Sequence, residues 1–195
     1  MTWVKICGIT NAADARLAVD EGADALGFIF HPKSKRYITP QRAAEIAARL
    51  PHHVMRVGVF VDVPLTFVQR VSGLAALDLS QVHGNETPGY VAALGNAMKA
   101  FRAGVCADRI DCYPGLILLD GPSGGSGQTA DLRLAMHLAR RRPVVLAGGL
   151  TPQNVAARIR AVRPFGVDVA SGTEASPGRK DAAKLRAFIR AARAA

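Results

Sequence analysis

The chain has 195 residues, of which 49% are hydrophobic and 21% are charged, and its formal net charge is +10. These proportions are near those of soluble globular domains and argue against a disordered chain. No apolar run is long enough to span a bilayer, and the N-terminus lacks the layout of a signal peptide. We therefore expect a single domain over residues 1–195, located in the cytoplasm and without a membrane partner.

The basic charge raises the question of a nucleic-acid partner. The arginines are spread over helical segments such as 157–166 and 184–195, and aromatic residues make up only 6% of the chain. No stacking motif of the single-strand-binding kind is present. We therefore expect no nucleic-acid partner, and the positive charge equally suits an anionic small substrate.

The three cysteines do not indicate a disulfide framework or a metal site. Cys106 and Cys112 have neither the spacing nor the histidine partners of a zinc site, and Cys7 stands far from both. We expect free, reduced thiols and no bound metal.

Short apolar runs alternate with amphipathic segments along the whole chain. The runs are predicted to be strands over 3–9, 25–30, 56–62, 77–84, 97–104, 115–121, 143–150 and 166–172. Helical spacing is found over 43–50, 90–94, 131–141, 154–162 and 181–195. Thr39, Thr87 and Thr151 each precede a proline, which predicts a helix N-cap at each threonine. The fifth unit leaves room for only a stub of helix.

About eight strand–helix alternations predict an α/β fold, the (β/α)8 barrel, with eight parallel strands and outer helices. A doubly wound open sheet is the main alternative. Against it, the first strand-to-helix turn, "CGITN", lacks the glycine fingerprint of a dinucleotide-binding sheet.

Polar residues end several of the predicted strands, where the active sites of parallel barrels lie. Strand alternation places Lys5 and Cys7 on one face and Val4 with Ile6 on the other. We expect the apolar pair to pack on the helices, with the lysine and the thiol facing the barrel interior.

Asp120 and His83 are candidates for the same site. Asp120 either caps the turn after its strand or acts as a proton-transfer group, and spacing does not separate the two. The glycine-rich segment behind it, 121–127, is able to approach a ligand closely. His83 is either a structural residue or a substrate ligand, and Asp62 is interpreted as structural.

The last two strands end in turns that suit an anion. Gly148 and Gly149 precede a helix, and Ser171 and Gly172 follow the eighth strand. Backbone N–H groups at such turns bind phosphate, which barrels frequently hold after strands seven and eight. Arg36, in the loop "HPKSKRY", either meets a carboxylate with its planar fork or is a surface cation.

Several motifs together resemble a known family. "VKICGIT", "GADALGFIFHPKSKRYI", "VGVFVD", "QVHGNE", "LLDGPSGGSGQT", "VVLAGGLTPQNV" and "GVDVASGTEASPGRKD" are similar, in the same order, to phosphoribosylanthranilate isomerases of tryptophan biosynthesis. One departure is "TADL", where Ala130 and Leu132 replace two aromatics of the family pattern.

The resemblance implies a (β/α)8 barrel that performs an Amadori rearrangement without cofactor or metal. It implies that Cys7 is the general base and Asp120 the general acid. The substrate, a small phosphosugar, would be bound through Arg36, with its phosphate at Gly148, Gly149, Ser171 and Gly172. Lys5 and His83 are added as candidate substrate-binding residues because they end their predicted strands. A free thiol has a pKa of about 8.5, so Lys5 is the candidate cation that favours the thiolate of Cys7.

Two other functions compete with this one. The first is the aminoaldose phosphate isomerase of histidine biosynthesis, whose family uses a pair of aspartates at opposite strand ends. The presence of Cys7 at the first strand argues against it. The second is a barrel that binds a phosphometabolite or nucleic acid without catalysis, which only the charge of +10 supports. We expect a monomer or a homodimer.

Overall fold

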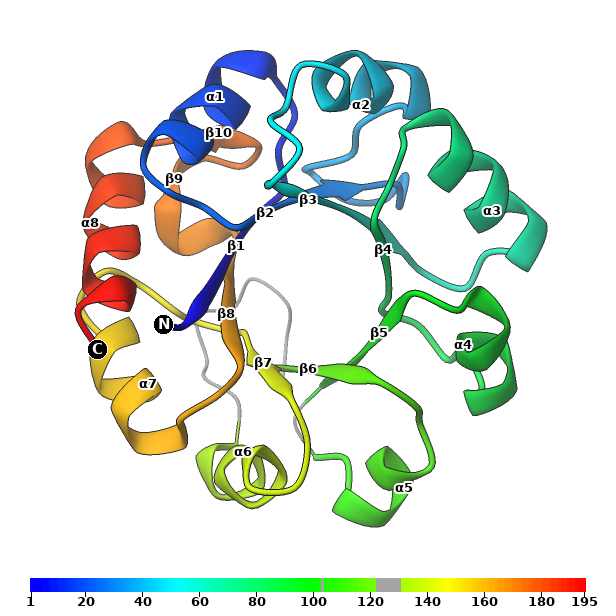
Figure 1. Ribbon diagram of the computed structural model, residues 1–195, viewed down its shortest axis with the longest axis vertical. Coiled ribbons are helices and arrows are strands. Elements are labelled where there is room, and N and C mark those ends of the chain that lie inside the picture. Colours follow the sequence, from blue (N-terminus) through cyan, green and yellow to red (C-terminus); the bar gives the residue numbers. More distant parts are fainter. Residues whose placement is uncertain (103, 122–130) are drawn as a thin grey trace.

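The computed structural model describes residues 1–102, 104–121 and 131–195. Eight parallel strands form a closed barrel in which each strand pairs with the next and β8 pairs with β1 (Figure 1). The strands are β1 (Trp3–Cys7), β2 (Ala25–Ile29), β3 (Met55–Phe60), β4 (Leu79–Val82), β5 (Ala97–Arg102), β6 (Leu116–Asp120), β7 (Val144–Leu146) and β8 (Gly166–Val169). The predicted fold class is confirmed, and closure between β1 and β8 excludes the open sheet.

Helices surround the barrel in chain order (Figure 1). They are α1 (Ala12–Asp20), α2 (Pro40–Ala47), α3 (Leu65–Leu74), α4 (Pro88–Leu94), α5 (Ala107–Asp111), α6 (Leu132–Ala139), α7 (Val155–Val162) and α8 (Ala182–Arg193). The stub predicted for the fifth unit is the short α5. Within the described ranges, no helix is long and apolar enough to cross a membrane.

Two of the three predicted threonine caps are confirmed. The side chains of Thr39 and Thr87 accept hydrogen bonds from amides three residues further on, at the starts of α2 and α4. The third prediction is wrong, because α7 begins only at Val155. Thr151 instead enters a separate turn, in which its own N–H donates to the side chain of Asn154 at 2.9 Å.

The chain after β8 differs from the prediction. Strand eight ends at Val169, and residues 171–173 form a short 3₁₀ helix, η1 (Ser171–Thr173). An unpredicted antiparallel hairpin follows, formed by β9 (Glu174–Ser176) and β10 (Arg179–Lys180). The glycine-rich segment 122–130, including Ala130 of the "TADL" departure, lies outside the described residues.

Apolar side chains fill both sides of the sheet. On β1, Val4 and Ile6 are fully buried in the same core as Phe188 of α8, as the alternation predicts. Inside the barrel, Met98 and Leu118 belong to a second cluster, against which Trp3 packs from the start of β1. The interior is therefore apolar towards the strand starts, so that the polar side chains gather at the strand ends.

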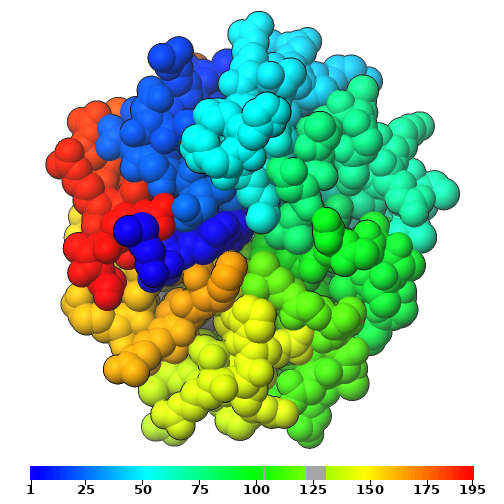
Figure 2. Space-filling view, viewed as in Figure 1, coloured from blue at the N-terminus to red at the C-terminus, as the bar shows by residue number. Residues whose placement is uncertain are grey.

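The two ends of the chain meet on the face where the strands begin. Figure 2 shows the N-terminal segment, in blue, beside the C-terminal helix, in red. Arg193 of α8 donates to the carbonyl of Thr2 at 2.7 Å and to the carboxylate of Asp24 at 2.8 Å. These contacts attach the last helix to the segment that leads into the first strand.

Phe188→Ala should lower the free energy of unfolding by about 3 to 5 kcal/mol, because it removes a fully buried ring and leaves a cavity. Phe165→Ala is the matched control, since that ring is half exposed and its loss should have a much smaller effect. Urea unfolding followed by circular dichroism measures both. Equal losses would contradict this description of the core.

Candidate active site

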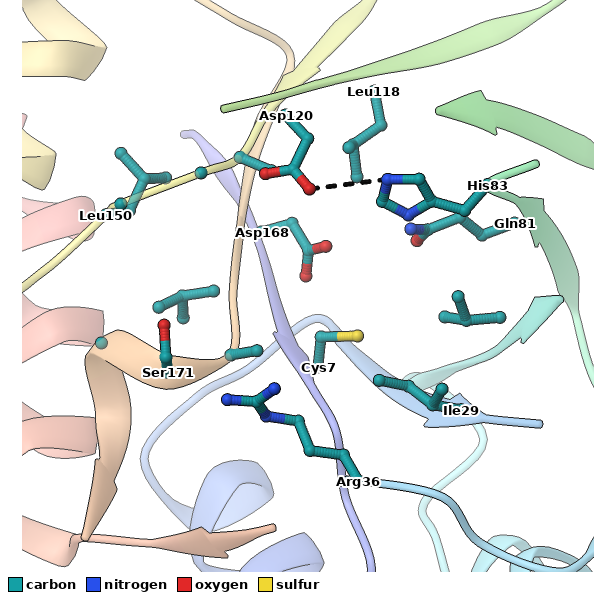
Figure 3. Close-up of a pocket in the computed structure, with 17 residues that line it drawn as sticks. Cys7, Ile29, Arg36, Gln81, His83, Leu118, Asp120, Leu150, Asp168 and Ser171 are labelled. Atoms are coloured by element: carbon teal, nitrogen blue, oxygen red, sulfur yellow. Dashed lines mark ion pairs between the residues drawn. The ribbon is translucent and has the colours of Figure 1, made fainter. Parts of the chain in front are cut away.

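A cavity of about 160 Å³ opens at the carboxyl ends of the strands. Eight residues singled out from the sequence line it: Cys7, Arg36, His83, Asp120, Gly148, Gly149, Ser171 and Gly172. In Figure 3, Cys7 and Arg36 lie on one side of the cavity, and Asp120 and His83 on the other. The ninth, Lys5, lies beneath the lining and is fully buried.

Cys7 ends β1 and is only 6% exposed. Burial raises the pKa of the Cys7 thiol, because water no longer stabilises the thiolate, while Lys5 acts in the opposite direction and Asp168 adds to the increase. The direction of the Lys5 effect on the Cys7 pKa is the one that the sequence analysis expects. Burial outweighs it, so the pKa is above its usual value.

Lys5 forms a buried ion pair that the sequence analysis did not identify. Its Nζ lies 2.9 Å from Oδ1 of Asp168, the residue paired with it across the β1–β8 register. Burial lowers the pKa of Lys5, but Asp168 and Cys7 together raise it above the usual value. Asp168 also lines the cavity. The same alternation of side chains, applied to the eighth strand "GVDVASG", would have placed Asp168 on the interior face with Lys5.

Asp120 ends β6 and reaches the cavity from a largely buried position. Burial raises the pKa of its carboxyl group, although the N–H of Gly121, which donates to Oδ1 at 2.8 Å, acts in the opposite direction. The carboxyl group therefore both accepts a local backbone hydrogen bond and faces the cavity. A raised pKa favours the protonated form that a general acid needs.

Gly148 allows this placement of Asp120. It has a φ of 80°, and a Cβ atom there would collide with the backbone nitrogen of Gly121. A side chain at this position is therefore excluded by backbone conformation and by space.

His83 lies across the cavity mouth from the thiol, with Nε2 at 3.5 Å from Oδ2 of Asp120 (dashed line, Figure 3). Burial, with the positive charges of Arg102 and Lys99, lowers the pKa of His83 to about 4. The ring is therefore neutral at pH 7, and its contact with Asp120 is not an ion pair. A neutral imidazole offers one donor and one acceptor.

Arg36 is held by a protein carboxylate. Its Nε and Nη2 atoms donate to the two oxygens of Glu174, each at 2.7 Å, and its side chain is only 18% exposed. Arg36 is thus a partly buried, ion-paired residue, and the carboxylate that meets its planar fork in this structure belongs to the protein. Glu174 belongs to the unpredicted hairpin, so no local sequence pattern could have identified it.

The turns after β7 and β8 approach each other at the rim of the cavity. Gly148 and Gly149 both have positive φ, and a Cβ atom on Gly172 would collide with the carbonyl oxygen of Leu150. Ser171 begins η1 beside Gly172. The close approach of two turns places short stretches of backbone, rather than bulky side chains, at this edge of the cavity.

Gln81 adds an acceptor to the floor of the site. It is 2% exposed, lines the cavity, and its Oε1 has no hydrogen-bond partner in the described part of the chain. Such a buried orphan acceptor costs about 1 to 3 kcal/mol unless a ligand supplies a donor. It therefore suits a ligand with a hydroxyl group.

Among residues 1–102, 104–121 and 131–195, no three His, Cys, Asp or Glu side chains are grouped so as to hold a metal ion. All three thiols are free, and Cys106 and Cys112 are exposed. The polar groups of the cavity are thus available as proton donors, proton acceptors and hydrogen-bonding groups.

A closed (β/α)8 barrel with a thiol and a carboxyl group across one cavity has the arrangement that an acid–base enzyme requires. The family model "N-(5'phosphoribosyl)anthranilate (PRA) isomerase" matches residues 4–191, and the chain belongs to this family. A relative of that name from Geobacter metallireducens is 46% identical over 202 residues, with 100% of both chains covered.

Solved structures agree with this membership. The phosphoribosyl anthranilate isomerase from Thermotoga maritima has a TM-score of 0.92 and 42% identity, with both chains fully covered. A family enzyme in complex with reduced 1-(o-carboxyphenylamino)-1-deoxyribulose 5-phosphate has a TM-score of 0.89 and 40% identity over the full length of both chains. A further similar structure is of monomers generated from the dimeric T. maritima enzyme.

Asp168→Asn should lower the free energy of unfolding by about 3 to 5 kcal/mol, because it leaves the ammonium of Lys5 buried without a counter-charge. Asp20→Asn is the control. It removes one partner of the exposed Arg16–Asp20 pair and should change the free energy by less than about 1 kcal/mol. Chemical unfolding at pH 7 compares them, and an Asp168→Asn variant as stable as the control would contradict the buried pair.

Proposed function

We propose that Cys7 is the general base and Asp120 the general acid with which this isomerase of tryptophan biosynthesis acts. The observation that carries the proposal is that the two groups face one cavity from different strands, β1 and β6 (Figure 3). The direction of the Asp120 pKa supports its part, because burial favours the protonated carboxyl group.

The substrate that fits this site is N-(5-phosphoribosyl)anthranilate, an aminosugar phosphate with an anion at each end. Its phosphate would accept hydrogen bonds from backbone N–H groups at the turns of Gly148, Gly149, Ser171 and Gly172. Its anthranilate would lie towards Arg36, whose guanidinium group lines the cavity. The family enzyme solved with a reduced phosphate-bearing product analogue supports this choice of ligand.

The reaction needs one proton donated and one removed. Asp120 donates a proton to the furanose ring oxygen, the bond from that oxygen to C1′ breaks, and the amine nitrogen forms a Schiff base with C1′. The thiolate of Cys7 then removes the proton from C2′, and its bonding electrons form an enolamine. The enolamine tautomerises to the ketone. Acid–base assistance of this kind contributes about 10²- to 10⁴-fold.

Lys5, His83 and Gln81 complete the site. Lys5 favours the thiolate through its positive charge, in opposition to burial. His83, neutral at pH 7, donates a hydrogen bond to the sugar or accepts one from it. The unpartnered Oε1 of Gln81 accepts one from a sugar hydroxyl. His83 and Gln81, which line the cavity, would orient the substrate between the base and the acid.

We further propose that residues 1–195 form a single catalytic domain that acts in the cytoplasm without a nucleic-acid partner. A homodimer is supported by the dimeric T. maritima relative, and a monomer is the other state consistent with the chain. No cofactor is needed, because both proton transfers use side chains of the chain itself.

Cys7→Ala and Asp120→Asn should each lower kcat by about 10²- to 10⁴-fold, because each removes one proton-transfer group. Cys106→Ala is the control, since it removes an exposed thiol away from the cavity and should leave kcat unchanged. The loss of anthranilate fluorescence with fresh substrate measures turnover. Near-normal kcat in either site variant would remove that residue from its role.

The dependence of kcat/KM on pH should be bell-shaped. Activity needs a protonated Asp120 and a deprotonated Cys7, while a carboxyl group ordinarily titrates several pH units below a thiol. Between the two pKa values the active fraction is constant. Below the pKa of Asp120 the acid is fully protonated, so activity falls as the remaining thiolate of Cys7 is protonated. Above the pKa of Cys7 the base is fully ionised, so activity falls as the remaining protonated Asp120 is lost. The acid limb therefore bends at the pKa of Asp120 and the alkaline limb at the pKa of Cys7.

Because burial raises the Cys7 pKa, the alkaline limb should lie above the usual range of thiols. In Cys7→Ser, whose hydroxyl does not ionise in this range, the residual turnover should lack that limb. Initial rates from pH 5 to pH 10 test this. An alkaline limb that persists unchanged in Cys7→Ser would show that another group titrates.

A further inference from the structure

The hairpin formed by β9 and β10 is fixed against the start of α1, and Figure 1 shows it between α1 and α8. Thr10 Oγ1 donates to the carbonyl of Gly178 at 2.5 Å, and the N–H of Lys180 donates to Asp14 at 2.8 Å. The N–H of Gly178 also donates to Glu174 at 3.3 Å. The hairpin is thus held in place by its backbone N–H and C=O groups, one of which bonds the carboxylate of Glu174, while the ammonium group of Lys180 makes separate contacts.

The ammonium group of Lys180 is buried against the backbone of Cys7. Its Nζ donates to the carbonyl of Cys7 at 2.7 Å and to the carbonyl of Ala170 at 3.0 Å, and lies 3.4 Å from Oε1 of Glu174. These three contacts use all three donors of the group. They connect the backbone at the end of β1 with the backbone just after β8.

Stability alone does not explain a charge in this place. Removing two ions from water is so costly that apolar replacements of buried pairs are often neutral or stabilising. The side chains of Lys180 and Glu174 are nevertheless 0% and 4% exposed. Glu174 also accepts both hydrogen bonds from Arg36, so one buried carboxylate joins the cation at Cys7 to the guanidinium group in the cavity.

We propose that Lys180 is a positioning residue for the isomerisation: its ammonium group holds Cys7 at the cavity and favours the thiolate, and Glu174 links it to Arg36. The inference rests on the proposed role of Cys7 as the base.

The charged groups facing the thiol come from several elements. Lys5, on β1, is paired at 2.9 Å with Asp168, on β8. Arg36, after β2, has both of its bonds to Glu174 at 2.7 Å. Lys180 shares that same carboxylate from 3.4 Å, the longest of these ion contacts. Lys180 and Arg36 thus share one carboxylate as their counter-charge, whereas Lys5 pairs with Asp168.

The direction of the pKa changes agrees with this arrangement. Burial raises the pKa of Cys7, and the positive charges of Lys5 and Lys180 act in the opposite direction. Burial lowers the pKa of Lys180 in turn, while Glu174 and the ionised thiol raise it. Removing the Lys180 ammonium group should therefore leave the thiol harder to ionise.

The test measures the alkylation rate of Cys7 by iodoacetamide as a function of pH, with the modified residue identified by mass spectrometry. The background is Cys106→Ser with Cys112→Ser, because both of those thiols are exposed. Lys180→Met should move the midpoint up by about one pH unit. The matched control is Lys184→Met. Lys184 lies on α8, and its ammonium group donates to the backbone carbonyl of Glu174 in the hairpin at 2.9 Å. This control should keep the parent midpoint.

A second variant tests the proposal with the opposite sign. Glu174→Gln removes a negative charge from the same cluster and should move the midpoint down. Loosening alone would also lower the midpoint by hydrating the thiol, so Thr10→Val, which removes a hairpin hydrogen bond without changing the charge, is its control and should keep the parent midpoint. If Lys180→Met fails to fold by circular dichroism, this variant decides alone. A midpoint in Lys180→Met equal to that of Lys184→Met, or one in Glu174→Gln that is unchanged or raised, would overturn the proposal.

Turnover separates this inference from the proposed function. In Lys180→Met, the plateau of kcat/KM should fall about tenfold and its alkaline limb should move up with the alkylation midpoint. Full activity in Cys7→Ala would overturn the assignment of the base and leave the alkylation result valid. A normal midpoint in Lys180→Met beside an inactive Cys7→Ala would overturn only the role of Lys180.

Discussion

The pairing of β1 with β8 is the interaction on which the rest of the structure depends. Its register sets Lys5 opposite Asp168, and their side chains form a 2.9 Å ion pair between residues 163 positions apart. That pairing closes the barrel and places Cys7 beside the loop after β8. The same closure brings Lys180 of the hairpin against the backbone carbonyl of Cys7. The site therefore exists only when the first and last strands meet.

Burial has opposite consequences for the two proposed proton-transfer groups. It favours the protonated form of each, which suits Asp120 as an acid and opposes the ionisation that Cys7 needs as a base. The cations Lys5 and Lys180 both lie on the thiol side, where their charge offsets this effect. On the carboxyl side, the neutral ring of His83 adds no full charge. One cavity can thus hold an acid and a base whose needs differ.

Close backbone packing shapes the other half of the cavity. Gly148 leaves room for the turn at Gly121 that receives the Asp120 carboxyl group, and Gly172 leaves room for the carbonyl of Leu150. The rim after β7 and β8 therefore presents main-chain groups to a ligand. Such groups suit an anionic substituent at this edge, on the side of the barrel where the first and last strands also join.

The sequence by itself determined the features that depend on local periodicity. Strand alternation placed Lys5 and Cys7 in the interior, and the caps at Thr39 and Thr87 were confirmed, because these patterns involve residues a few positions apart. The family followed from motifs in order. Only the tertiary structure decided that Asp168, Glu174 and Lys180 surround the site, since their partners lie in distant segments. Burial, which sets the thiol and carboxyl pKa values, likewise arises only when the barrel closes.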